Sequence, residues 1–238
     1  MNANRRTFIT FAGAVLGASA LPLPLHAAAD ARKLKVGIIG SGRIGGTLGT
    51  IWAKAGHEVM LSSRNLDDDK ALAAKIGARA GTPREAVMFG DVVLLAVPYG
   101  AIPQLGKDLA DVLKGKVIID AANPFEGRDG EVAKWAKEKG PGVASAELLP
   151  GARIVRGFNA VGAARLPGIA EKRGDPVAMP IASDDANAVA VASRLIRDAG
   201  FEPVLVGGLA KGRHLVPGTP LAGERSPEEV RKIAATLN

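Results

Sequence analysis

The amino-acid sequence predicts an α/β fold of the doubly wound type with a mostly parallel sheet, because three features occur together. Short apolar runs typical of strands buried on both faces recur along the chain. Segments with helical periodicity separate these runs, as in sheets whose parallel strands are joined by helices. Near its end the chain returns to strand, helix and strand, which predicts a small C-terminal α/β extension.

The first strand–turn–helix unit contains a glycine-rich turn. The apolar run Lys35–Ile39 leads into Gly40-Ser41-Gly42-Arg43-Ile44-Gly45, and a helix is expected over residues 46–55. The three glycines suit a tight turn, close approach of the backbone to a pyrophosphate, and close packing of helix on strand. The free N–H groups of the helix N-terminus favour phosphate. Because the turn lies between a predicted strand and a predicted helix, it predicts a Rossmann-type dinucleotide site. The glycine spacing alone would be weak evidence for such a site.

The second strand indicates which dinucleotide binds. A strand over residues 57–61 is followed by Ser62-Ser63-Arg64-Asn65, where a protein that prefers NAD usually carries an acidic residue for the ribose 2′-hydroxyl. Ser63 offers a hydroxyl group and Arg64 a guanidinium group to a 2′-phosphate. The sequence therefore favours NADP(H), and an ordinary exposed arginine is the competing interpretation.

Three consecutive acids, Asp67-Asp68-Asp69, follow this strand. They are interpreted as the start of a helix that runs to about Ile76 and is ended by Gly77. Consecutive side chains point in different directions on a helix, so we expect these carboxylates not to converge on a metal ion. The chain has no cysteine to supply thiolate ligands or disulfides, and no metal site is predicted.

The rest of the chain continues the alternation of strands and helices. A strand over residues 91–97 is stopped by Pro98, and a helix is expected over residues 101–113. Further strands are expected at 116–120, 153–157, 177–182 and 203–206, with a helix at 185–199. Residues 217–225 are rich in Pro and Gly and predict a loop. Ser226, followed by proline and Glu229, then has the pattern of a capped helix start.

The charge distribution argues against a nucleic-acid ligand. The chain carries 31 Lys and Arg against 24 Asp and Glu, a net charge of +7, and only 4% of its residues are aromatic. The basic residues are scattered, so neither a stripe that follows a phosphate backbone nor a platform for stacked bases is predicted. The expected partner is a small molecule.

The first 29 residues have the order of a signal peptide. Arg5 and Arg6 precede a moderately apolar stretch over residues 8–21, and Ala27-Ala28-Ala29 offers small residues for cleavage. The paired arginines followed by Thr-Phe-Ile resemble the twin-arginine export motif. We therefore expect residues 1–29 to be a signal peptide, residues 30–238 to be a single NADP-binding domain, and the mature protein to be periplasmic. The stretch is short for a membrane span, so an N-terminal anchor is the less favoured alternative.

Taken in order, several motifs resemble those of the coenzyme-F420-dependent NADP oxidoreductases, whose relatives include the cytoplasmic reductase domains of the STEAP metalloreductases. The likeness runs from about Lys35 to Leu221. It rests on the glycine turn and on the segments 56–59, 62–65, 97–99, 120–124, 155–163 and 200–203. The resemblance implies NADP(H) as cofactor, F420 or a flavin as co-substrate, and a homodimer.

The resemblance also implies roles for individual residues. Ser41 to Ile44 would hold the pyrophosphate, and Ser63 with Arg64 would hold the 2′-phosphate. Val97 and Pro98 would border the ribose and nicotinamide, and the positions beside the nicotinamide ring would be Asn159, Val161 and Ala163. Some archaeal members have histidine at the position of Asn159, a difference that concerns deazaflavin use more than NADP(H) binding.

No catalytic residue is predicted. Hydride transfer between a nicotinamide and a flavin-like ring needs two rings held close together in a dry slot rather than an acid or a base. His214 is interpreted as a solvated loop residue, with a proton donor as the alternative. Arg213 is a candidate contact for an anionic tail of the acceptor, as the resemblance suggests.

Two other functions compete with an NADP-dependent oxidoreductase that uses a flavin-like or other small acceptor. An imine reductase or β-hydroxyacid dehydrogenase shares the glycine turn and the following arginine. Such enzymes typically have a long helical C-terminal domain, which this sequence does not predict. A non-catalytic NADP(H)-binding or redox-sensing protein would keep the dinucleotide site without turnover, and the sequence does not separate this alternative from an enzyme.

Overall fold

The structure is a computed structural model of the chain and describes residues 33–172 and 174–237. Residues Lys33–Asn238 form one compact unit. The predicted signal peptide over residues 1–29 lies outside the described residues. Among the helices that are described, none is long and apolar enough to cross a membrane.

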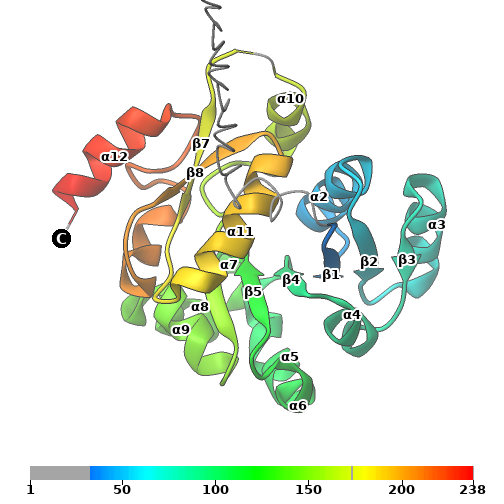
Figure 1. The fold of residues 1–238 in the computed structure, drawn as a ribbon. Coiled ribbons are helices and arrows are strands. Elements are labelled where there is room, and N and C mark those ends of the chain that lie inside the picture. The colour runs from blue at the N-terminus through cyan, green and yellow to red at the C-terminus, as the bar shows by residue number, and fades with distance from the viewer. Residues whose placement is uncertain (1–32, 173, 238) are drawn as a thin grey trace, which may run out of the picture. The chain divides into compact units, whose positions relative to one another are not determined.

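Six parallel strands form the main sheet, in the order β3-β2-β1-β4-β5-β6 (Figure 1). Their bounds are β1 Lys35–Ile39, β2 Glu58–Ser62, β3 Arg79–Ala80, β4 Val92–Leu95, β5 Val117–Asp120 and β6 Arg153–Arg156. The strand order reverses between β1 and β4, as in Rossmann-type folds, whose ligands bind beyond the carboxyl ends of the strands at this point. The predicted doubly wound parallel fold is therefore confirmed.

The two faces of this sheet carry separate hydrophobic cores. One core includes residues of α2 (Arg43–Lys54), α3 (Leu66–Ile76), α10 (Leu166–Ala170) and α11 (Ala186–Asp198). The other includes residues of α4 (Pro83–Phe89), α5 (Ile102–Asp108), α6 (Ala110–Leu113), α8 (Glu131–Lys139) and α9 (Pro141–Leu148). Val92 and Leu94 of β4 face the first core, whereas Val93 and Leu95 face the second. Burial on both faces explains why the strands are unbroken apolar runs.

The C-terminal extension is a second, two-stranded parallel sheet. It consists of β7 (Val177–Ile181) and β8 (Phe201–Leu205), which α11 connects, and α12 (Pro227–Thr236) packs against both strands. An antiparallel bridge joins it to the main sheet, because the N–H of Arg156 donates to the carbonyl oxygen of Ala182 at 2.9 Å. The carboxyl end of β7 therefore lies beside the carboxyl end of β6.

Several helical segments differ from the sequence-based expectation. The helix expected over residues 101–113 is divided into a 3-10 turn, η1 (Tyr99–Ala101), and the helices α5 and α6. The division falls at Leu109, whose φ of −115° and ψ of 7° lie outside the helical range. Short elements that were not predicted from the sequence are β3, α4, α7 (Glu126–Asp129), α8, α9, α10, η2 (Ala163–Arg165) and η3 (Leu209–Leu215). The capping box of Ser226 and Glu229 at the start of α12 is confirmed.

Three aromatic rings connect the first half of the fold to the C-terminal extension. Trp52 of α2 and Phe158, which follows β6, are both fully buried, and their ring centroids are 6.0 Å apart in an edge-to-face arrangement. Phe158 makes a similar contact with Phe201 of β8 at 6.1 Å. The indole N–H of Trp52 also donates to the carbonyl oxygen of Leu195 in α11 at 2.7 Å. These contacts fix the backbone of the β6 loop against α2 and α11.

Replacement of Trp52 by phenylalanine should therefore destabilise the protein. Trp52→Phe leaves a cavity in the core and removes the hydrogen bond to Leu195, so we expect the free energy of unfolding to fall by about 1–3 kcal/mol. Urea denaturation followed by circular dichroism measures this change. The other tryptophan, half-buried Trp135, provides a matched control, because Trp135→Phe should cost less than about 1 kcal/mol. Equal losses in the two variants would contradict this account.

Candidate active site

The segments predicted to bind the dinucleotide all lie at one edge of the main sheet. Because the six strands are parallel, their carboxyl ends meet at the same edge. The glycine turn Gly40–Gly45 follows β1, Ser63 and Arg64 follow β2, and Val97 and Pro98 follow β4. The segment from Asn159 to Ala163 follows β6. The fold thus brings four segments that are far apart in the sequence to the same edge of the sheet.

The three glycines of the turn have different surroundings. A Cβ atom added at Gly45 would lie 2.0 Å from the carbonyl oxygen of Gly40, and one added at Gly40 would lie 2.4 Å from that of Ala96. A Cβ atom at Gly42 would meet no atom within 4 Å. Gly40 and Gly45 therefore allow close packing of turn, strand and helix, whereas Gly42 leaves open space beside the backbone.

The start of α2 offers unsatisfied donors next to that open space. Gly42 is the N-cap residue of this helix, and no side chain caps its first turn. No acidic side chain lies in the first turn, and Arg43 is exposed there. A helix N-terminus with free N–H groups and no carboxylate is a favourable place for a phosphate group.

A buried carboxylate links this turn to the loop after β2. Asp69 of α3 is fully buried, and it accepts hydrogen bonds from the hydroxyl of Ser41 and, at 2.9 Å, from that of Ser63. The Ser63 hydroxyl has a single proton. While that proton is directed at Asp69, Ser63 cannot donate it to a bound anion. Of Ser63 and Arg64, the exposed Arg64 is therefore the residue that can bind an anion.

Asp69 is a site residue that the sequence analysis missed. The predicted helix is confirmed as α3, which has all three acids in its first turn and ends at Ile76 before Gly77. The sequence analysis did not predict that Asp69 is buried while Asp67 and Asp68 are exposed. A signal was present, because Asp69 lies on the same helical face as the apolar residues Leu72, Ala73 and Ile76.

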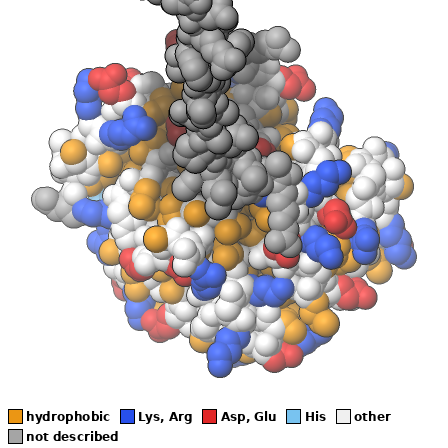
Figure 2. Space-filling model, in the orientation of Figure 1, with side chains coloured by type: hydrophobic (Ala, Val, Ile, Leu, Met, Phe, Trp, Pro, Cys, Tyr) orange, Lys and Arg blue, Asp and Glu red, His pale blue; other side chains and the backbone are white. Residues whose placement is uncertain are grey.

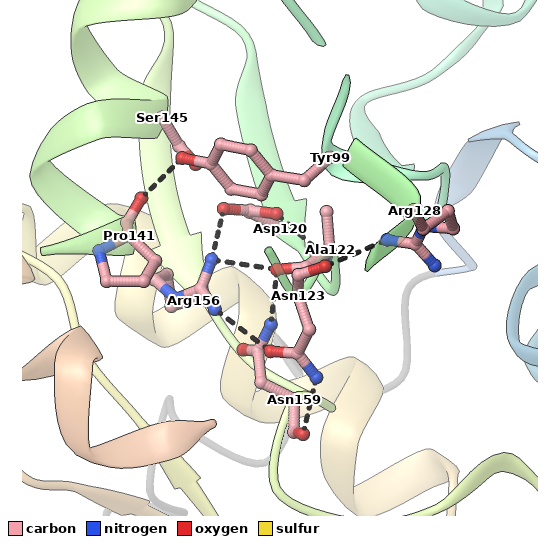
Figure 3. A network of polar contacts seen from close by, with 9 residues as sticks. All are labelled: Tyr99, Asp120, Ala122, Asn123, Arg128, Pro141, Ser145, Arg156 and Asn159. Atoms are coloured by element: carbon pink, nitrogen blue, oxygen red, sulfur yellow. Dashed lines mark hydrogen bonds and ion pairs between the residues drawn. The ribbon is translucent and has the colours of Figure 1, made fainter. Parts of the chain in front are cut away.

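On the other side of the strand reversal, a buried ion pair joins β5 to β6. Asp120 and Arg156 are the last residues of these strands and are both fully buried, with 2.7 Å between Oδ2 and Nη1 (Figure 3). The other carboxylate oxygen accepts the N–H of Ala122 at 2.9 Å. The guanidinium also donates to the carbonyl oxygen of Ala122 at 3.1 Å and to Oδ1 of Asn123 at 3.3 Å.

This pair extends to the residue predicted to lie beside the nicotinamide. The side-chain amide of Asn123 donates to the carbonyl oxygen of Asn159 at 2.9 Å. Asn159 is only 2% exposed, and its own amide donates to the carbonyl oxygen of Ala122 at 3.2 Å. Its Oδ1 atom is buried and accepts no hydrogen bond from the described residues. The loops after β5 and β6 therefore form one connected unit with an unsatisfied acceptor.

The backbone just before Asn159 is strained. Phe158 has φ of 63°, the left-handed region, and it is the only residue other than glycine with positive φ in the described part of the chain. Such a conformation costs on the order of 1–3 kcal/mol. The buried ring contacts with Trp52 and Phe201 hold it in place. The packing of the Phe158 ring thus stabilises the strained backbone that positions Asn159 after β6.

Tyr99, directly after Pro98, cannot serve as an acid or a base near neutral pH. Its hydroxyl lies 3.0 Å from the hydroxyl of Ser145 and 3.0 Å from the carbonyl oxygen of Pro141. Burial, together with the charge of Asp120, raises the pKa of Tyr99 well above its ordinary value. The side chain therefore stays protonated and acts as a support for the loop after β4.

The two residues considered for the acceptor lie in η3 rather than in a loop. Arg213 is exposed, and its guanidinium lies 3.5 Å from the carbonyl oxygen of Lys139, at the junction of α8 and α9. His214 is half-buried. The prediction that His214 lies in a loop is therefore wrong, because this segment forms a 3-10 helix.

Comparison with known proteins identifies the family. A profile described as NADP oxidoreductase, coenzyme F420-dependent, matches residues 35–124. The F420-dependent NADP reductase of Methanothermobacter thermautotrophicus is 30% identical over 206 residues, which cover 79% of this chain and 87% of that protein. The chain belongs to this family of NADP-dependent oxidoreductases. The resemblance drawn from the motifs is thus confirmed at the level of the family.

The chain is also similar to a metalloreductase and to a solved structure. The metalloreductase STEAP3 of Rattus norvegicus is 32% identical over 181 residues, which cover 76% of this chain and 35% of that protein. The chain therefore spans about a third of this relative. The crystal structure of the hypothetical protein SMa0349 from Sinorhizobium meliloti has a TM-score of 0.68 and 25% identity, and covers 84% of this chain and 98% of its own.

The residues at the carboxyl edge fit the dinucleotide of the family. The open side of Gly42 and the uncapped start of α2 leave room and donors for a pyrophosphate. The exposed guanidinium of Arg64 suits a 2′-phosphate. The buried, unpartnered Oδ1 of Asn159 is an acceptor without a donor at the predicted nicotinamide position.

Removal of Arg156 should be far more costly than removal of both members of its ion pair. Arg156→Met leaves the Asp120 carboxylate buried without a counter-ion, so we expect the free energy of unfolding to fall by about 3–5 kcal/mol. The double variant Asp120→Asn with Arg156→Met carries no buried charge and should recover at least about 2 kcal/mol of that loss. Urea denaturation of both variants at pH 7 measures the difference. A double variant as unstable as the single one would refute the ion-pair account.

Proposed function

We propose that this chain transfers hydride between NADP(H) and a small planar acceptor of the flavin or deazaflavin type. The observation that carries the proposal is the convergence of the open glycine turn, Arg64 and the Asn123–Asn159 unit on one edge of the sheet, at the point where the strand order reverses. Membership of the NADP oxidoreductase family supports it.

The proposal assigns the phosphate groups to the first half of the fold. Ser41–Ile44 would hold the pyrophosphate, since the N–H groups at the start of α2 are free of side-chain caps. Arg64 would hold the 2′-phosphate through charge-assisted hydrogen bonds. Ser63 would border the phosphate while its hydroxyl group donates to Asp69. Asp69 would act as a positioning residue, because it fixes the hydroxyl groups of both Ser41 and Ser63.

The second half of the fold would surround the nicotinamide. Val97 and Pro98 border the proposed ring position on one side, and Asn159, Val161 and Ala163 border it on the other. Asn159 and Val161 are almost fully buried, so water is largely excluded around them. When bound, NADPH supplies the hydride, and the protein contributes orientation and a dry environment rather than an acid or a base. The raised pKa of Tyr99, which keeps this side chain protonated, is consistent with a site that uses no general base.

The decisive test of the function is anaerobic oxidation of NADPH by a panel of acceptors. Purified protein is mixed with NADPH and, in turn, with F420, FMN, FAD and a ferric chelate. We expect at least one acceptor to be reduced at a rate proportional to protein concentration. Tight NADPH binding with no reduction of any acceptor would instead favour the alternative function, a non-catalytic NADP(H)-binding or redox-sensing protein.

An imine or β-hydroxyacid reductase receives less support. Those enzymes typically carry a long helical domain after the nucleotide domain. Here the described chain continues after β6 through η2, α10, β7, α11, β8, η3 and α12, and the longest of these helices, α11, has 13 residues. Helix α11 and η3 pack against the main sheet, and α12 packs on the two-stranded sheet of β7 and β8, so these described elements do not form a separate helical domain.

Arg64 should determine the preference for NADPH over NADH. Arg64→Gln removes the charge that faces the 2′-phosphate, so we expect the Kd for NADPH to rise about 10- to 100-fold, whereas the Kd for NADH should stay within about twofold. Fluorescence titration measures both constants. Arg79→Gln, which changes an exposed arginine at the opposite edge, should alter neither. An equal loss for NADPH and NADH would contradict the assignment of Arg64 to the 2′-phosphate.

We also propose that the chain is exported in folded form by the twin-arginine route. This proposal rests on the sequence around Arg5 and Arg6, which lies outside the described residues. Replacement of both by lysine should leave the protein in the cytoplasm, as measured by cell fractionation and immunoblotting. Wild-type protein retained in the cytoplasm to the same extent would contradict export. A tightly held NADP(H), loaded before export, would supply the cofactor.

The remaining partner predictions stay open to experiment. On the face drawn in Figure 2, the visible Lys and Arg side chains are interspersed with Asp and Glu and do not merge into one basic surface. A small-molecule partner rather than nucleic acid stays a prediction. A homodimer stays a prediction, which sedimentation of the purified protein tests.

A further inference from the structure

An exposed aromatic ring and an exposed guanidinium group lie together on the turn after β5. Phe125 is 46% exposed, and it is the one aromatic residue among the large apolar side chains that are exposed in the described part of the chain. The guanidinium carbon of Arg128 lies 5.1 Å from its ring centroid. We call these two residues the Phe125–Arg128 pair.

The pair is held rigidly from behind. Asp129, whose side chain is 1% exposed, accepts hydrogen bonds from Nε of Arg128 at 2.9 Å and from Nη2 at 2.8 Å. The same carboxylate accepts the N–H of Phe125 at 3.1 Å. An arginine side chain fixed in this way loses little conformational entropy when a ligand binds. The backbone of Phe125 is held by the same carboxylate. The buried carboxylate stays behind the guanidinium, so the positive group is the one presented to solvent.

The pair is connected to three segments of the proposed nicotinamide site. Nη2 of Arg128 donates to the carbonyl oxygen of Asn123 at 2.9 Å, and the Asn123 side chain donates to Asn159. The turn α7 packs against η1, directly after Val97 and Pro98. Figure 3 shows Arg128 on the opposite side of Asn123 from the buried Arg156. The pair therefore stands at the carboxyl edge, outside the buried ion pair.

We infer that the Phe125–Arg128 pair is the binding surface for the hydride acceptor, and that this acceptor is a planar aromatic ring system carrying a phosphate or another anionic group. This inference rests on the proposed function and names the acceptor's chemical class. An aromatic ring stacks on the face of Phe125. Nη1 of Arg128, which donates to no acceptor among the described residues, is available to pair with the anion.

A comparison of FMN with riboflavin tests both parts of the inference, because the two share one ring system and only FMN carries a phosphate. Full-length protein saturated with NADP+ is titrated with each flavin, and quenching of flavin fluorescence gives the Kd. We expect wild-type protein to bind FMN more tightly than riboflavin. Arg128→Gln should raise the Kd for FMN about tenfold and leave that for riboflavin unchanged. Phe125→Leu should raise both constants about 3- to 10-fold.

The chain offers a matched control at the opposite edge of the sheet. Arg79 lies over the ring of Phe89, with 5.2 Å from its guanidinium carbon to the ring centroid. The same ring is close to Lys35, the first residue of β1, so this pair lies at the amino ends of the strands. Arg79→Gln should change neither flavin constant. Thermal unfolding of each variant checks that the fold is retained, as expected for exposed positions.

Three results would overturn the inference. The first is a wild-type protein that binds neither flavin. The second is flavin binding that is unaffected by Phe125→Leu and Arg128→Gln in folded protein. The third is a loss of NADP+ affinity in Arg128→Gln without a loss of FMN affinity, which would assign Arg128 to the dinucleotide instead. These titrations involve no turnover, so they distinguish the two failures. Flavin binding that depends on the pair but is not followed by NADPH oxidation would refute hydride transfer, whereas NADPH oxidation that is unaffected by both substitutions would refute the binding surface.

Discussion

Asp120 and Arg156 are both completely buried, and the arrangement of the carboxyl edge depends on this ion pair. Removing two charges from water costs several kcal/mol per ion, and only close, well-oriented partners offset that cost. Two glycines make room for the arginine. A Cβ atom at Gly212 would lie 2.7 Å from Cδ of Arg156, and one at Gly142 would lie 3.0 Å from it. Helix α9 and η3 are thereby held against the end of β6.

The buried charge also sets the direction of the neighbouring amide groups. A guanidinium group only donates, so Asn123 must turn its oxygen toward Arg156 and its nitrogen toward the carbonyl oxygen of Asn159. A carbonyl oxygen only accepts, so the Asn159 amide nitrogen must face Ala122. The unsatisfied Oδ1 of Asn159 follows from the contact with Ala122. Arg156 thus fixes the orientation of the Asn123 amide, and the carbonyl oxygen of Ala122 fixes that of the Asn159 amide.

The sequence predicts the repeating part of the fold well, because strands buried on both faces must be continuous apolar runs. It also predicts the glycine turn, since close packing at Gly40 and Gly45 excludes larger residues. Short polar helices such as α7 have no comparable periodicity and were not predicted. Helix α4 could have been predicted, because Thr82 and Glu85 form a capping box at its start. The roles of Asp69 and Arg156 depend on contacts between distant segments, which spacing along the chain does not encode.

In the proposed function the nicotinamide is held in one orientation at this edge and passes hydride directly to an acceptor. Single-turnover oxidation of NADPH labelled with deuterium at one or the other prochiral position of nicotinamide C4 tests this arrangement. Deuterium should leave from one position only, and only this label should slow the reaction. Loss of label from both positions, or bound NADPH that no acceptor oxidises, would contradict it.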